Sequence, residues 1–255
     1  MILDIIITTL INGSTYALLA IGFSLIFGVA RIVNIAHTAF YMLAAYAIFV
    51  CTHRLGIPPF FAMCIAIPLA VVIGVVTYKL FIEPIREHEA AVLIATIALA
   101  MILQEVMLLL FSGEYRSVPP LITGYLQAGN VKIAYQQLLT IGMALLSLGG
   151  VWVFLKNTRL GLAIRSTAQD REVANLMGMN EARVAVLTMA ISVGLAAFTG
   201  AVVVPLSVVN PHMWMHPLVM MMAVVVLGGM GSLKGSFAGA YILGFAEALV
   251  VFLIP

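Results

Sequence analysis

Charged residues are scarce in this sequence. Lys, Arg, Asp and Glu together make up 9% of its 255 residues, whereas hydrophobic residues make up 64%. Soluble globular domains carry about 25% charged residues, so this composition excludes an ordinary soluble domain. Several apolar runs are long enough to cross a bilayer, which takes about 20 residues in a helix. The composition therefore predicts an all-α protein, a polytopic transmembrane helical bundle.

Cysteines and clustered basic residues are also lacking. The only two cysteines, Cys51 and Cys64, lie in or beside apolar segments, which predicts neither a disulfide framework nor a zinc site. The Lys and Arg residues form no cluster of the kind that follows phosphates, so nucleic acid is not an expected partner. No basic residue precedes the first apolar run, whose first charge is Asp4. We therefore expect a first membrane span there and no cleaved signal peptide.

Signatures of catalysis are incomplete. A phosphate-binding loop needs glycine before its lysine and Ser or Thr after it, but residues 228–235 place Leu233 before the lysine and Gly235 after it. The stretch that begins at His88 reads HEAAV, so Val92 stands where a zinc protease has its second histidine ligand. A Gly-x-Ser-x-Gly elbow is absent as well. We predict no catalytic residue, no metal and no cofactor in this chain.

Eight apolar segments are expected to span the membrane as one domain over residues 1–255. They are 2–30, 35–52, 59–81, 90–111, 134–155, 184–209, 213–230 and 236–254. If each segment crosses, placing the polar loop 156–183 inside puts nine Lys and Arg residues inside and three outside. The three outside are Arg54, Arg116 and Lys132. Because cytoplasmic loops carry the excess of basic residues, we expect the N-terminus outside and loop 156–183 in the cytoplasm.

Loop 156–183 is the only long polar run, and it carries five of the twelve Lys and Arg residues. Residue chemistry predicts a short helix in it from Ala168 to Met177. Thr167 can accept from the first N–H groups while Asp170 reaches back to it, and Gly178 suits the left-handed residue that ends a helix.

One face of this predicted helix is apolar. Val173, Leu176 and Met177 fall at i, i+3 and i+4, and polar residues surround them. The polar residues are Asp170, Arg171, Glu172 and Asn175. Such an apolar knob fits either a groove in another protein or a helix folded back on its own membrane domain. The residues alone favour neither.

Polar residues enter the apolar segments in few places. Asn12, Ser14, Thr15 and Tyr16 interrupt the first segment, residues 34–38 open the second, and two glutamates lie deep in the fourth and eighth. A carboxylate at membrane depth costs a few kcal/mol, so it normally faces a cavity, the bundle interior or a partner. The candidates for a substrate path are Asn12, Tyr16, Asn34, His37, Glu105 and Glu247. The alternative is hydrogen bonding between helices, and for His37 we favour a structural role at a helix start.

Glycines recur in the run that begins at Gly228. Gly231, Gly235 and Gly239 follow at four-residue spacing, and Gly229 lies in the turn before them. Small residues on one helix face let another backbone approach closely. We favour close helix packing and keep a gating hinge as the alternative.

Four stretches resemble the permease subunits of bacterial ABC importers of the branched-chain amino acid class. They are NGSTYALLAIGFSLIFGV from Asn12, NIAH from Asn34, TRLGLAIRSTAQDREVANLMGMN from Thr158 and LGGMGSLKGSFAGAYILGFAEAL from Leu227. The resemblance covers essentially the whole chain. Thr38 stands where the family usually has glycine, and Lys234 where it commonly has proline. The family also usually continues through a further apolar segment, so we expect either truncation or a bare end after Pro255.

The resemblance also implies which partner subunits complete the importer. Two cytoplasmic ABC ATPase subunits would hydrolyse ATP, and each permease would offer a coupling helix, here 168–177, to a groove on its ATPase. The residues that would couple to the ATPase are Gly161, Arg165, Asp170, Arg171, Val173, Leu176, Met177 and Gly178. A homologous second permease would complete the pore in the bacterial cytoplasmic membrane. An extracytoplasmic substrate-binding protein would meet loops 112–133 and 210–216.

The mechanism implied is ATP-driven alternating access for branched-chain amino acids or related small polar substrates. Other amino acids, urea, short amides and aromatic acids remain open as cargo. A rival hypothesis is a self-contained secondary transporter or channel, with an ion-coupling role for Glu105 and Glu247 and no soluble partner. A membrane scaffold without a transport path is the third, and it predicts that both glutamates tolerate replacement by leucine.

Overall fold

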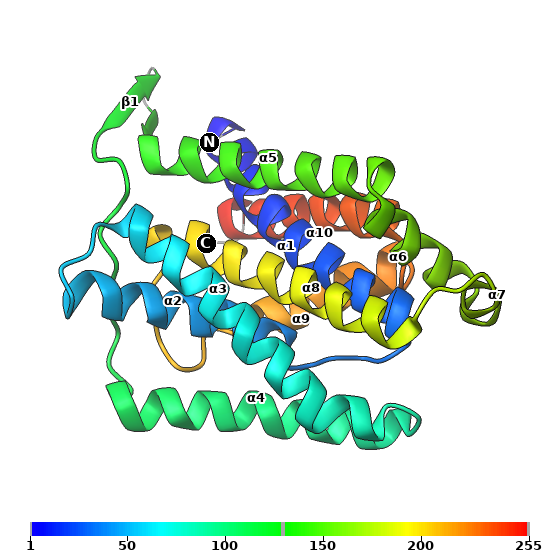
Figure 1. The fold of residues 1–255 in the computed structure, drawn as a ribbon. Helices are drawn as coiled ribbons and strands as arrows, with labels where there is room; N and C mark the ends of the chain where they lie inside the picture. The colour runs from blue at the N-terminus through cyan, green and yellow to red at the C-terminus, as the bar shows by residue number, and fades with distance from the viewer. Residues whose placement is uncertain (1, 129–130, 254–255) are drawn as a thin grey trace.

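The computed structural model describes residues 2–128 and 131–253, and it is almost entirely helical (Figure 1). The helices are α1 Ile2–Ala30, α2 His37–His53, α3 Pro59–Thr77, α4 Glu89–Phe111, α5 Tyr135–Asn157, α6 Arg159–Gln169, α7 Arg171–Leu176, α8 Glu181–Val203, α9 Met215–Gly228 and α10 Leu233–Leu253. A π turn, Tyr78–Ile82, and a 3-10 turn, Glu83–Ile85, extend α3, and a 3-10 turn, Val204–Leu206, extends α8. The prediction of an all-α polytopic bundle is confirmed.

In the described part of the chain, six helices are long and apolar enough to cross a membrane, namely α1, α3, α4, α5, α8 and α10 with the turns that extend them. The remaining two apolar segments also form helices, but α2 has 17 residues and α9 has 14. A 14-residue helix is about 21 Å long, which is shorter than the hydrocarbon core of about 30 Å. The predicted count of about eight spans is roughly consistent with this arrangement.

Helix α1 forms the centre of the bundle. It lies between α5 and α8 and packs along most of its length against α10 (Figure 1). From Gly13 to Ile26 every residue of α1 is buried. A helix that is apolar on all sides is expected in the interior of a bundle, and this position satisfies that expectation.

Glycines permit the closest helix contacts. A Cβ atom on Gly244 of α10 would lie 2.7 Å from the backbone nitrogen of Gly13 in α1. At Gly200 of α8 a Cβ atom would overlap the carbonyl oxygen of Tyr41 in α2. Because these neighbours are backbone atoms that cannot rotate away, each glycine sets how closely its two helices approach.

Helix α4 stands at the edge of the bundle, where it contacts α2 and the π turn after α3 (Figure 1). Its inner face is fixed by Gln104, whose Oε1 accepts a 2.9 Å hydrogen bond from Nε1 of Trp214. Its outer face is exposed along its length, with Leu109 84% exposed. This face is therefore free to meet lipid or another chain.

The two ends of the bundle differ. At one end, hereafter the hairpin end, β1 Tyr125–Ala128 pairs antiparallel with β2 Val131–Ala134 (Figure 1). The strands lie in and just beyond a segment for which the sequence predicted only a loop. Backbone hydrogen bonds of 2.9 and 2.8 Å join Arg116 of that segment to Val209. Helices α6 and α7 project at the opposite end, hereafter the α7 end (Figure 1).

The predicted helix from Ala168 to Met177 is wrong at its start. Thr167 and Ala168 belong to α6, and Thr167 is buried there. The chain breaks at Asp170, whose side chain accepts a 3.0 Å hydrogen bond from the backbone nitrogen of Val173 and so caps α7. Thr158 caps α6 in the same way, through a 2.9 Å bond from Gly161. Two caps three residues ahead of their donors produce two helices where we had predicted one.

Candidate functional site

A polar cluster joins three helices within the membrane-spanning part of the bundle. Oε2 of Glu247, on α10, accepts hydrogen bonds from Nδ2 of Asn12 at 3.0 Å and from the hydroxyl of Tyr16 at 2.6 Å, both on α1. Oε1 of Glu247 lies 3.4 Å from Nε2 of His216, at the start of α9. Asn12, Tyr16 and Glu247 are thus three of the predicted path residues, and the structure brings them together.

The cluster opens to the surface of this chain. The side chain of Glu247 is 21% exposed and that of His216 is 65% exposed, whereas Tyr16 is buried at 4%. Nearby, the hydroxyls of Ser14 and Tyr241 lie 2.9 Å apart and also link α1 to α10. Glu247 follows the first residue of α10 by 14 positions, which places it about 20 Å along the helix from the α7 end. The carboxylate therefore lies within the membrane-spanning length, nearer to the hairpin end of α10 than to the α7 end, and its side chain is partly exposed.

Asn34 and His37 occupy a different place, inside the packed core. His37 begins α2 and is fully buried, and its Nδ1 lies 3.2 Å from the hydroxyl of Ser192 on α8. The same hydroxyl donates a 2.7 Å hydrogen bond to the carbonyl of Gly22 on α1. Nδ2 of Asn34 contacts the sulfur of Met189 at 3.8 Å. His37 thus joins α1, α2 and α8.

Glu105 lies apart from the other candidates. It is exposed on the outer face of α4, one residue after Gln104, which points inward to Trp214. Among the described residues it forms neither a hydrogen bond nor an ion pair. The structure therefore places the two intramembrane glutamates in different surroundings.

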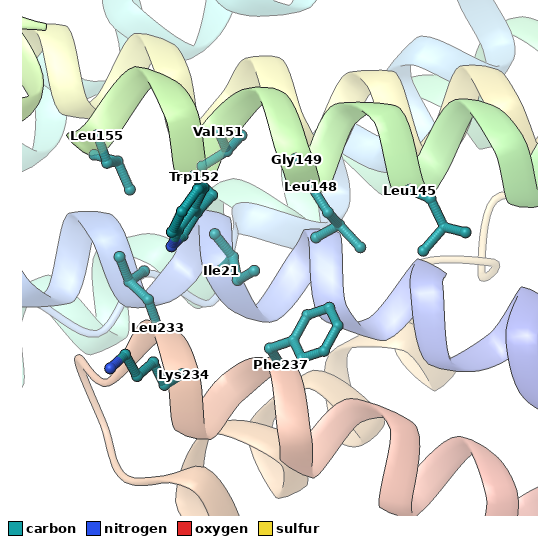
Figure 2. Close-up of a pocket in the computed structure, with 10 residues that line it drawn as sticks. All are labelled: Ile21, Leu145, Leu148, Gly149, Val151, Trp152, Leu155, Leu233, Lys234 and Phe237. Carbon is teal, nitrogen blue, oxygen red and sulfur yellow. The ribbon is translucent and has the colours of Figure 1, made fainter. Parts of the chain in front are cut away.

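An apolar groove of about 470 Å³ lies between α5, α1 and α10 (Figure 2). Trp152 and Leu148 of α5 face Ile21 of α1, and Phe237 of α10 closes the opposite side (Figure 2). Among the residues that the structure describes, Lys234 at its edge is the only charged one in its lining. A zwitterion would find few polar partners on these walls, so we place no substrate here.

The α7 end carries exposed apolar side chains. Leu176 is 86% exposed, Met177 is 77% exposed and Val173 is 53% exposed, while Ala174 faces inward and is buried. Arg165 is exposed on α6, and Gly178 ends α7 with a φ of 85°. Gly161 sits against the backbone of Phe154 and Leu155, so α6 leaves α5 at a tight corner. We call Val173, Leu176 and Met177 the α7 knob.

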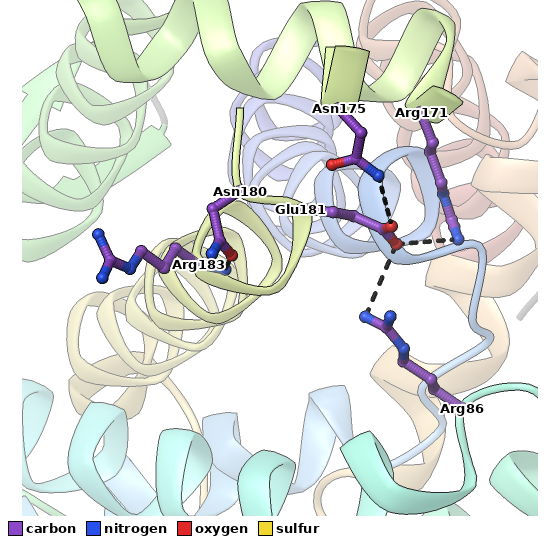
Figure 3. A network of polar contacts seen from close by, with 6 residues as sticks. All are labelled: Arg86, Arg171, Asn175, Asn180, Glu181 and Arg183. Carbon is purple, nitrogen blue, oxygen red and sulfur yellow. Dashed lines mark hydrogen bonds and ion pairs between the residues drawn. The ribbon is translucent and has the colours of Figure 1, made fainter. Parts of the chain in front are cut away.

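Glu181, the first residue of α8, holds α7 in place (Figure 3). Its Oε1 lies 3.4 Å from Nη1 of Arg171 and 3.6 Å from Nη1 of Arg86, and its Oε2 accepts from Nδ2 of Asn175 at 3.4 Å. Burial lowers the pKa of Arg171 from its ordinary value, and the negative charge of Glu181 acts in the opposite sense. The contacts connect α7 both to α8 and to the segment before α4. The sequence analysis singled out Arg171 but neither Arg86 nor Glu181.

Replacing Glu181 with alanine is expected to loosen α7 without unfolding the bundle. Arg171 and Arg86 would then lie close together without the carboxylate that separates their charges, so the orientation of α7 would be lost. The loss should favour local opening of α7 by about 1 kcal/mol, which raises the population of the open form about fivefold. Because cleavage follows that population, we expect limited proteolysis between residues 165 and 180 to accelerate about fivefold.

The matched control for this experiment is Glu172→Ala. Glu172 is exposed on α7 and forms no ion pair among the described residues, so its cleavage rate should stay near that of the wild type. Equal cleavage rates in the two variants would contradict the role given to Glu181.

The glycines near Gly228 fall into two groups. Gly228 at the end of α9 and Gly235 in α10 face each other, and a Cβ atom on either one would overlap the backbone of the other. A Cβ atom on Gly239 would lie 3.0 Å from the carbonyl oxygen of Val224. Gly229 and Gly231 occupy the turn between the helices with φ of 87° and 84°. The first group packs helices, and the second permits a sharp turn.

His216 is the residue of the Glu247 cluster that sequence reasoning missed. It begins a short helix in the run Met215-His216-Pro217, and nothing in that run indicates which helix it will face. Only its position in an apolar segment, next to a proline that favours a helix start, marks it as unusual.

Comparison with known proteins supplies a family. Residues 5–255 match the family model described as "Branched-chain amino acid transport system / permease component". The chain is 31% identical over 251 residues to the high-affinity branched-chain amino acid transport system permease protein BraD of Pseudomonas aeruginosa, covering 92% of this chain and 82% of BraD. It is 30% identical over 252 residues to the protein LivH of Escherichia coli K12, named in the same way, covering 93% of this chain and 82% of LivH.

Two further likenesses are more distant. A probable branched-chain amino acid transport permease protein LivH of Methanocaldococcus jannaschii is 24% identical over 255 residues, covering 95% of this chain and 79% of that protein. The solved structure of PsaBC from Streptococcus pneumoniae in complex with Fab aligns with a TM-score of 0.47 and 19% identity, covering 98% of this chain and 81% of that one.

Proposed function

The chain belongs to the family of branched-chain amino acid transport system permease components, and from this premise we propose that it forms half of the translocation path of an ABC importer for branched-chain amino acids or related small substrates. It is a multi-pass membrane protein. In the proposed orientation the α7 end lies in the cytoplasm and the hairpin end lies outside, which agrees with the excess of Lys and Arg in the loops at the α7 end.

The α7 knob is the observation that carries this proposal. Leu176 and Met177 are among the most exposed apolar side chains of the chain, and they lie on a six-residue helix beyond the spans. Apolar side chains gathered on a water-facing surface mark a site of protein contact. A secondary transporter that acts alone has no use for such a helix, whereas an importer driven by separate ATPase subunits needs a mechanical contact with them.

The contacts of α7 would transmit its displacement to the membrane-spanning helices. ATP binding would draw two ATPase subunits together, and each would carry an α7 with it. Because Glu181 joins Arg171 of α7 to the start of α8 and to Arg86, displacement of α7 would reach α8 and the segment between α3 and α4. The free energy of the change comes from the tighter binding of nucleotide to one of the two states. ATP hydrolysis belongs to the partner subunits in this proposal.

The remaining partners follow from surfaces that this chain leaves open. A second permease chain would complete the pore, and the exposed face of α4 with Glu105 is one surface available to it. An extracytoplasmic binding protein would meet the hairpin end, where backbone hydrogen bonds join Arg116, in the predicted contact loop 112–133, to Val209, the residue just before the predicted contact loop 210–216.

Purification of the tagged chain from its native membrane in mild detergent tests the proposal. We expect P-loop ATPases and a second permease to co-purify, and mass spectrometry would identify them. A variant with Leu176→Glu serves as the matched sample, because it should lose the ATPases and keep the permease. Recovery of the wild-type chain alone, under conditions that keep other ABC complexes whole, would favour the secondary transporter.

A further inference from the structure

We infer that the Glu247 cluster binds the positively charged ammonium group of the substrate on the outer half of the path. This inference rests on the proposed function and narrows its cargo to compounds that carry such a group. The cluster consists of Glu247 with Asn12, Tyr16 and His216.

The two carboxylate oxygens of Glu247 have different surroundings. Oε2 accepts both hydrogen bonds from α1, at 3.0 Å from Asn12 and 2.6 Å from Tyr16, so its direction is fixed. Among the described residues, Oε1 has only His216 beside it, at 3.4 Å. The Glu247 side chain as a whole is 21% exposed. One oxygen of this partly exposed carboxylate is thus held by two donors from α1, whereas the other has fewer partners.

The negative charge of Glu247 lacks a permanent counter-charge. In the described part of the chain no Lys or Arg forms an ion pair with it, and Asn12 and Tyr16 are neutral donors. His216 is 65% exposed and is positive only when protonated. An uncompensated carboxylate within the spans costs a few kcal/mol, and an arriving cation removes part of that cost. The site therefore attracts a positive group.

The depth of the cluster matches an early step of import. Glu247 lies about 20 Å along α10 from the α7 end, and α9 begins beside it with His216. With the α7 end in the cytoplasm, the cluster occupies the outer half of the membrane. A substrate released at the hairpin end would meet it before any of the buried polar residues around His37.

Charge separates the possible cargoes. Amino acids carry an ammonium group that can donate to Oε1, and their carboxylate can remain directed away from Glu247. Urea and short amides are neutral and gain little from a carboxylate. Aromatic acids without an amino group bring a second negative charge, which Glu247 repels. The cluster therefore selects amino acids among the cargoes that the sequence leaves open.

The test uses the complete importer in proteoliposomes, with uptake of L-leucine and hydrolysis of ATP measured together. Glu247→Gln removes the charge and keeps an oxygen that can accept from Asn12 and Tyr16. We expect leucine moved per ATP hydrolysed to fall about tenfold, while ATP hydrolysis stimulated by the binding protein stays within twofold. Ser14→Ala is the matched control, because it removes another polar contact between α1 and α10 without changing charge. The leucine moved per ATP hydrolysed by the Ser14→Ala variant should stay within twofold of the wild-type value.

A binding measurement separates recognition of the ammonium group from helix packing. Saturation-transfer NMR on the importer in nanodiscs would compare L-leucine with 2-hydroxy-4-methylpentanoate, which replaces the ammonium group with a hydroxyl. We expect the wild type to prefer leucine about tenfold and Glu247→Gln to lose this preference. If Glu247→Gln fails to assemble, Tyr16→Phe provides the second variant, with an expected loss of preference of about threefold because Oε2 loses its shorter hydrogen bond.

The outcomes are distinct. An unchanged preference and an unchanged transport ratio in Glu247→Gln would overturn the inference and leave the importer intact. A wild-type complex that transports urea or a short amide but no amino acid would also overturn the inference. A wild-type complex that transports none of the candidate cargoes in the presence of its ATPases and binding protein would overturn the proposed function instead, before any variant is compared.

Discussion

Replacement of Leu176 with glutamate is expected to abolish transport while leaving the membrane bundle folded. Leu176 is 86% exposed and contributes most to the α7 knob, so the substitution removes no packing inside this chain. In a complex it would bury a charge in an apolar groove of the ATPase, which costs several kcal/mol. We expect substrate uptake to fall at least about a hundredfold, which corresponds to a loss of about 2.7 kcal/mol or more in the free energy of binding between permease and ATPase.

The measurement is uptake in proteoliposomes together with the amount of ATPase that co-purifies with the permease. Leu55→Glu is the matched control, since Leu55 is also exposed, at 64%, but lies in the loop between α2 and α3 at the hairpin end. It should retain its ATPase partners. If Leu176→Glu retains them as well and transports normally, the α7 knob is not the site of coupling.

Replacement of Gly235 with alanine is expected to destabilise the bundle. A Cβ atom there would overlap the carbonyl group of Gly228, and neither backbone can move without separating α9 from α10. Overpacking of a core usually costs about 1–3 kcal/mol, and a clash between backbone atoms belongs at the upper end of that range. We expect the detergent-solubilised protein to lose its monodisperse elution peak at a temperature about 10 °C lower than the wild type.

Gly142→Ala provides the control, because Gly142 also lies in a helix, α5, and no atom stands within 4 Å of the position that its Cβ would occupy. Alanine is favoured over glycine in a helix by about 1 kcal/mol, so this variant should be at least as stable as the wild type. Equal melting of the two variants would show that α9 and α10 approach less closely than the structure indicates.

Sequence reasoning located the spans well because each one is a long apolar run bounded by polar residues. The first segment was placed at 2–30, which is the extent of α1, and the fourth was placed at 90–111, one residue inside α4. Periodicity added little here, because helices that are apolar on all sides show no preferred face. The arrangement of the helices around α1 could therefore not be read from the sequence.

The loop beyond α5 shows how two valid signals can compete. Thr167 followed by Asp170 has the spacing of a cap, yet Thr158 already caps a helix that runs through Thr167 to Gln169. Asp170 then acts as the cap itself. Local chemistry identified both the polar face and Gly178 as the helix end, but it could not decide which of two overlapping caps is used.

The candidate site was predicted only in part. Asn12, Tyr16 and Glu247 stand out in sequence because polar groups inside apolar runs require partners, and here they are partners of one another. Glu105 satisfies the same criterion, yet it faces outward, and the described part of the chain gives it no partner. His216 could not be assigned to the cluster before the direction of α9 was known.

The position of α1 has a consequence for how the protein is made. Its polar residues find their partners on α10, since Asn12 and Tyr16 bind Glu247 and Ser14 contacts Tyr241. Translation at about 5–20 residues per second separates the emergence of these two helices by roughly ten to forty seconds. During that interval the polar side of α1 has no finished neighbour. We expect the insertion machinery or a membrane chaperone to shelter nascent α1 until α10 arrives.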